Sequence, residues 1–140
     1  MTAAASDRRE WGGGPIRVGI SACLLGEEVR YDGSHKRDSF LVDTFGRFVE
    51  WVPVCPEVEA GFGTPREVMH LVRIDDEVRL ITVKTHHDVT ATLERAIDSR
   101  LRTLTEENLS GYVLKRSSPS CGLFRVKVYE AKGAPSAQGR

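Results

Sequence analysis

The chain has 140 residues, a length that favours one domain with a modest core. It carries 20 basic and 20 acidic residues, and a formal net charge of zero argues against a nucleic-acid surface that depends on bulk charge. No apolar run approaches the length of a membrane span, and the first residues lack the apolar core of a signal peptide. We therefore expect a cytoplasmic protein that binds neither membrane nor nucleic acid.

Two tails flank the predicted domain. Residues 1–14 are polar and end in a run of glycines, and residues 131–140 have a similar composition, so both segments are predicted to be flexible. The folded domain is expected over residues 15–130.

The first half of this domain contains two predicted strands. Ile16–Ser21 is short and β-branched, which indicates a buried strand. Ser39–Val49 places its aromatic and aliphatic residues at helical spacing and predicts a helix. Glu50–Val54 is predicted to be a second strand, although it contains Pro53. The segment 55–67 is dense in proline and glycine, and we expect a shaped loop with one short helical turn.

The second half is predicted to hold a hairpin, a long helix and two strands. Val68–Ile74 and Val78–Lys84 flank a polar turn, which is typical of a hairpin. His87–Asn108 carries one apolar stripe at steps of three and four and predicts a helix, with Asp88 or Thr90 as its cap. The remaining strands are expected at 112–114 and 124–129.

This order of elements predicts an α/β fold, namely a single compact domain with a mostly parallel sheet flanked by helices. In such sheets, ligands bind in the crevice beyond the carboxyl ends of the strands. The three cysteines, Cys23, Cys55 and Cys121, each follow the carboxyl end of a predicted strand. If those strands are parallel neighbours, three cysteines far apart in the sequence meet in one crevice.

Three gathered cysteines are compatible with several kinds of site. Thiolates are soft ligands that select zinc, copper(I) or iron–sulfur centres, and three of them leave one metal position open. Free cysteines are also common as small buried apolar residues, which would give them a structural role only. A zinc site with three cysteines and a metal- or sulfide-carrying module without catalysis are further alternatives.

Polar residues surround the cysteines in the sequence. Glu57 follows Cys55 closely and can act as an acid or base, and Ser117, Ser118 and Ser120 precede Cys121. Each also has a structural interpretation, as a helix-start charge or as loop geometry. Positive charge could line the crevice through five residues: Arg30, Lys36, Arg66, Lys115 and Arg116.

Three blocks of the sequence, "SACLLGEEVRYDGSHK", "VCPEVEAGFGTPRE" and "LKRSSPSCG", resemble the signature blocks of the bacterial family catalogued as domain of unknown function 523. Members of that family are thiouracil desulfidases, and the resemblance runs from about Ile16 to Tyr129. It implies a [4Fe-4S] cluster bound through Cys23, Cys55 and Cys121, with one iron free for the sulfur of a thiolated nucleobase.

The same resemblance implies the chemistry. Glu57 matches the family's catalytic carboxylate, and Ser117 matches its catalytic serine. The implied reaction removes sulfur without net redox change and gives a uracil-type base and sulfide. The implied partner is therefore a small thiolated base, and the zero net charge makes intact tRNA a poor candidate substrate.

Overall fold

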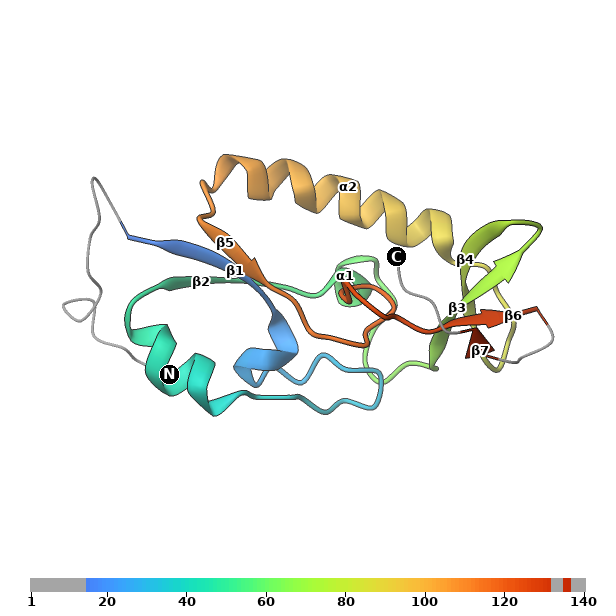
Figure 1. The fold of residues 1–140 in the computed structure, drawn as a ribbon, viewed down its shortest axis with the longest axis horizontal. Helices are drawn as coiled ribbons and strands as arrows, with labels where there is room; N and C mark the ends of the chain where they lie inside the picture. Colours follow the sequence, from blue (N-terminus) through green and yellow to red (C-terminus); the bar gives the residue numbers. More distant parts are fainter. Residues whose placement is uncertain (1–14, 132–134, 137–140) are drawn as a thin grey trace.

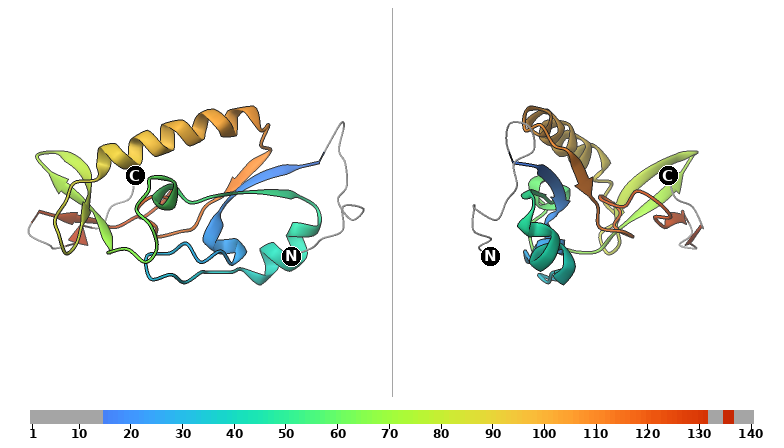
Figure 2. Two further views of the ribbon diagram at one scale, coloured as in Figure 1. Left: turned by 180° about the vertical axis from the view of Figure 1, so that it is seen from behind. Right: turned by 60° about the vertical axis from the view of Figure 1, so that its left-hand side comes forward.

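The computed structural model describes residues 15–131 and 135–136, drawn in Figure 1. The predicted tail at 1–14 and most of the segment 131–140 lie outside the described residues. Two sheets lie toward opposite ends of the domain, and the helix α2 (Thr90–Glu106) runs along one side from one sheet to the other (Figures 1 and 2).

The first sheet is parallel and contains the strands that carry the cysteine loops. Its order is β2 (Glu50–Val54), β1 (Arg17–Ser21) and β5 (Gly111–Val113), so β1 lies in the middle. The strands expected in these three places are confirmed. Ile20 of the central strand is fully buried. Pro53 has no backbone N–H. An edge strand such as β2 tolerates a proline because one of its sides has no neighbouring strand to bond.

The second sheet is mixed. The expected hairpin forms from β3 (Met69–Ile74) and β4 (Glu77–Thr82). β6 (Val128–Glu130) joins β3 in parallel, and β7 (Pro135–Ser136) pairs with β6 in antiparallel orientation. The α/β class is thus confirmed, with the sheet divided in two. The strand expected at 124–129 begins only at Val128, because the chain turns before it, with a φ of 53° at Arg125.

Short helical segments fill the connections of the first sheet. The helix expected over Ser39–Val49 is present over residues 40–47, as a π-helical segment that passes directly into a 3-10 turn. A Cβ at Gly46 would lie 3.0 Å from both Leu41 O and Trp51 Nε1, so this glycine allows Trp51 to pack closely. The short segments are η2 (Ala22–Leu25), η3 (Phe40–Thr44), η4 (Phe45–Arg47) and α1 (Pro56–Glu59).

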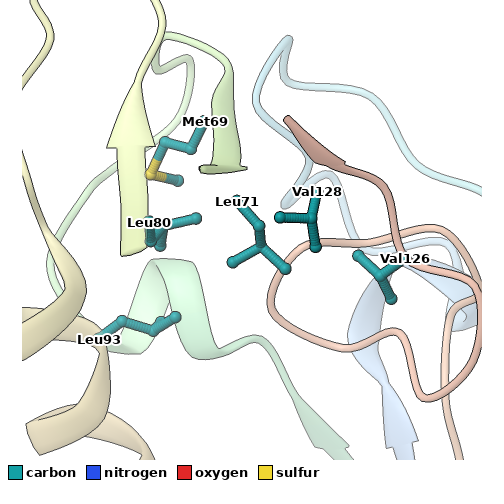
Figure 3. Close-up of a cluster of buried hydrophobic side chains, with 6 residues drawn as sticks. All are labelled: Met69, Leu71, Leu80, Leu93, Val126 and Val128. Atoms are coloured by element: carbon teal, nitrogen blue, oxygen red, sulfur yellow. The ribbon is translucent and has the colours of Figure 1, made fainter. Parts of the chain in front are cut away.

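The long helix packs mainly through its N-terminal half. Asp88 Oδ1 accepts the N–H of Thr90 at 3.0 Å, which satisfies one orphan donor at the helix start. Leu93 is buried, whereas Leu101, predicted in the same apolar stripe, is 54% exposed. The core against this half of α2 (Figure 3) consists of six residues: Met69, Leu71, Leu80, Leu93, Val126 and Val128.

Among the described residues, the helices are all too short or too polar to cross a membrane.

Candidate functional site

A cavity of about 360 Å³ lies between the two sheets. The loops after β1, β2 and β5 form one wall, and residues of β3 and β6 form another. A volume in this range suits a small organic ligand. The lining includes all three cysteines, with Glu57 and Ser117.

The three cysteines reach this cavity because their strands are parallel neighbours. Cys55 directly follows β2, and Cys23 lies in η2, two residues after the end of β1. Cys121 lies farther from its strand, in the loop that follows β5. All three are free thiols. Side-by-side strands running in the same direction therefore bring residues far apart in the sequence to one end of the sheet.

The thiols influence one another and their charged neighbours. Burial raises the pKa of Cys23, and the nearby Cys121 raises it further, while Lys115 and Arg30 oppose the shift. Burial also raises the pKa of Cys55, against a backbone hydrogen bond from Val58 and the charge of Arg66. The raised pKa values keep Cys23 and Cys55 as neutral thiols near pH 7, so binding of a metal centre must displace their protons.

Side chains fix the backbone around two of these cysteines. Glu59 Oε2 accepts the N–H of Cys55 at 3.0 Å, one turn along α1. Ser118 Oγ accepts the N–H groups of Ser120 at 3.3 Å and of Cys121 at 3.1 Å. Ser118 therefore shapes the loop, and Ser120 Oγ lies 3.8 Å from the Cys121 sulfur, within reach of a weak hydrogen bond.

Ser117 lines the cavity in an uncommon backbone conformation. Its φ of 62° lies in the left-handed region, which few residues other than glycine adopt. Strained conformations of this kind gather at functional sites. The glycine after Cys121 is also required by packing, since a Cβ at Gly122 would lie 2.5 Å from Val126 Cγ2 and 2.7 Å from Ser118 O.

Glu57 forms an ion pair with Arg66 in the cavity wall. Arg66 Nη2 lies 2.5 Å from Glu57 Oε2, and the two side chains are only 6% and 13% exposed. Sequence reasoning identified both residues but not their pairing. The ion pair between Glu57 and Arg66 depends on the three-dimensional course of the loop between them, which the sequence does not specify.

The other predicted cations divide into two groups. Arg30 and Lys115 line the cavity with Arg66, as expected. Lys36 and Arg116 are not part of its lining, but both lie near Lys115. Burial is the main cause that lowers the pKa of Lys115, and the charges of Arg30, Lys36 and Arg116 lower it further. This side of the cavity therefore has a positive potential that favours anionic groups.

Residues 18–140 match the sequence pattern of a family described as 2-thiouracil desulfurase. This match covers most of the chain. The chain belongs to the 2-thiouracil desulfurase family.

Two known proteins resemble this family member in structure or sequence. The solved structure of a [4Fe-4S]-dependent thiouracil desulfidase, TudS, has a TM-score of 0.69 and 33% sequence identity, and the match covers 89% of this chain and 80% of that one. The uncharacterized protein YbbK of Bacillus subtilis (strain 168) is 34% identical over an alignment of 112 residues, which covers 74% of this chain and 71% of YbbK.

The candidate metal donors of this desulfurase family member are the three thiols that line the cavity. Across the described residues, no three His, Cys, Asp or Glu side chains are grouped as a single metal ion requires. The three thiols that line one cavity are soft donors of the kind that iron–sulfur clusters take, so the residues present fit such a cluster.

Sequence reasoning missed one aromatic element of the site. The rings of His70 and Tyr129 stack at 4.1 Å between centroids with an interplanar angle of 7°, and both residues line the cavity. Burial lowers the pKa of His70, and Lys127 adds to this shift, so the imidazole is neutral near pH 7. His70 lies in β3 and Tyr129 in β6, and the sequence alone does not predict that these two strands pair in parallel.

Proposed function

We propose that this chain is a [4Fe-4S]-dependent enzyme that removes sulfur from a thiolated nucleobase of the thiouracil type. Water attacks the carbon of the C=S bond, and the products are a uracil-type base and sulfide, with no net oxidation or reduction. The observation that carries the proposal is one cavity lined by three cysteines, Glu57 and Ser117.

Cys23, Cys55 and Cys121 would hold the cluster. A [4Fe-4S] cluster normally takes four cysteines, and these are the three cysteines of the chain. When bound, the cluster would supply an open iron that binds a soft sulfur and makes the attached carbon more electrophilic.

The other residues would handle protons. Glu57 accepts a proton from the attacking water, because a carboxylate in a largely enclosed wall can act as a general base. Ser117 passes a proton to or from the ring, and its backbone conformation fixes where its hydroxyl can lie. Ser118 and Ser120 hold the loop around Cys121.

The cavity also bears on the substrate. A volume of about 360 Å³ suits a small heteroaromatic ring, and we propose a free thiolated base such as 2-thiouracil or 4-thiouracil rather than intact tRNA. We propose a cytoplasmic location for the same enzyme, where thiols stay reduced and available as ligands.

Two substitutions test the proposed proton transfers. Glu57→Ala and Ser117→Ala are each reconstituted anaerobically, and iron per chain and sulfide released from 2-thiouracil are measured. Both variants should load the cluster as wild type does and lose sulfide release by about 100-fold or more. Ser110→Ala, an exposed serine outside the cavity, is the matched control and should keep full release. Full sulfide release by Glu57→Ala would show that the chemistry does not need this carboxylate.

A further inference from the structure

The short helix α1 carries two Arg–Glu ion pairs in different surroundings. Glu57 pairs with Arg66 in the cavity wall, where both side chains are almost fully buried. Glu59, two residues later, pairs with Arg100 of α2 at 3.3 Å, outside the lining of the cavity and about one-third exposed. The second pair already ties α1 to the rest of the domain, so the first is not needed as a tether.

Arg66 is held on several sides. Its backbone N–H donates to Tyr31 O at 2.7 Å, and Nη1 donates to Gly63 O at 2.8 Å. Nη2 donates to Glu57 Oε2 at 2.5 Å. A guanidinium is planar and rigid, so anchoring one of its nitrogens to the Gly63 carbonyl fixes where the other can meet the carboxylate.

A purely stabilising role does not explain this arrangement well. Removing two charges from water costs about as much free energy as their attraction returns, so a buried ion pair is a weak source of stability. A carboxylate that must take a proton from water, in contrast, gains from being held in one orientation, because small misplacements slow a reaction strongly.

We propose that Arg66 is a positioning residue for the reaction. It engages Oε2 of Glu57 and so leaves Oε1 to accept the proton from the attacking water. This role rests on the proposed function of Glu57 and extends it to a residue that does not touch the reacting atoms.

The test compares kcat and KM for sulfide release from 2-thiouracil by reconstituted wild type and variants, with iron per chain and Tm as controls for loading and folding. Arg66→Gln should lower kcat about 10- to 100-fold with KM nearly unchanged and iron retained. Arg66→Lys keeps the charge but not the planar fork, so its kcat should lie between Arg66→Gln and wild type. Arg100→Gln, the matched control, removes the cation that pairs with Glu59 of α1 and should keep the kcat of wild type.

A double variant tests whether Arg66 acts through Glu57. If it does, Glu57→Gln/Arg66→Gln should be no slower than Glu57→Gln alone, because residues that act as a unit are not additive. This double variant removes both charges together and leaves no unpaired buried ion, which protects its folding.

Several outcomes overturn the role of Arg66. A wild-type kcat in Arg66→Gln would do so, as would a double variant slower than Glu57→Gln by the full factor of Arg66→Gln. If Arg66→Gln does not load iron, a wild-type kcat in Arg66→Lys overturns the role instead. A wild type that loads the cluster and releases no sulfide overturns the proposed function, and the role of Arg66 with it.

Discussion

Two glycines of the parallel sheet differ in the space around them and give a matched pair of substitutions. Gly19 in β1 pairs with Tyr112 in β5, and Gly111 is the residue before Tyr112. A Cβ at Gly19 would lie 2.5 Å from Tyr112 Cε2 and 3.1 Å from Leu109 Cδ1, whereas nothing lies within 4 Å of a Cβ at Gly111. Neither glycine has a positive φ, so alanine meets no backbone barrier at either site.

Gly19→Ala should destabilise the fold. Non-bonded carbon atoms pack at about 3.5–4.0 Å, so the Tyr112 ring must withdraw by about 1 Å, and the β1–β5 ladder prevents the backbones from separating. Forcing a methyl into a filled site costs about 1–3 kcal/mol. Gly111→Ala should be neutral or stabilising by up to about 1 kcal/mol, since it restricts only the unfolded chain.

Urea denaturation followed by far-UV circular dichroism measures both effects. A shift of the urea midpoint with an unchanged dependence of the unfolding free energy on urea reports a change in stability. A wild-type midpoint for Gly19→Ala, or an equal destabilisation of Gly111→Ala, would show that the contact with Tyr112 does not limit the space at Gly19. Gly19→Ala/Tyr112→Val, in which a smaller side chain vacates the contact, should recover part of the loss that Gly19→Ala causes.

Two other changes test contacts near and away from the site. Ser21→Ala removes the hydroxyl that accepts the N–H of Lys115 at 2.8 Å, so it should lower the free energy of unfolding by about 1–3 kcal/mol in urea titrations. Ser110→Ala, at an exposed position, should lower it by less than about 0.5 kcal/mol. Equal losses in the two variants would show that the Ser21–Lys115 hydrogen bond contributes nothing to stability. A hydrogen bond from Arg79 lowers the pKa of Asp88 from 3.8 to about 2, so the stabilisation by this carboxylate is complete above about pH 5 and is lost as the pH falls toward 2. Because Asp88 is exposed, Asp88→Asn should lose under about 1 kcal/mol at pH 6, and its difference from wild type should shrink in urea titrations at lower pH; a difference that stays constant down to pH 2.5 would contradict this assignment.

The sequence predicted the first sheet well because its strands are locally distinct. Ile16–Ser21 and Glu50–Val54 are short β-rich runs with clear ends, and the structure places strands there within one residue. Since these strands are parallel neighbours, the chain positions of Cys23 and Cys55 were enough to predict a shared crevice.

The remaining features depend on contacts that no local pattern encodes. The hairpin at 69–82 was clear in the sequence, but its parallel partner β6 follows a loop whose turn at Arg125 interrupts the apparent alternation. The His70–Tyr129 stack follows from that pairing and was therefore missed. In the same way, Leu101 fits the helical stripe, yet the second sheet covers only the first half of α2.

Anaerobic reconstitution followed by incubation with 2-thiouracil tests the central proposal most directly, with iron per chain and released sulfide measured on the same samples. We predict about four irons per wild-type chain and equal amounts of sulfide and uracil, whereas Cys55→Ala should bind little iron and release none. A wild type that loads no cluster, or a Cys55→Ala variant that releases sulfide at the wild-type rate, would contradict a cluster held by these three cysteines as the centre of the reaction.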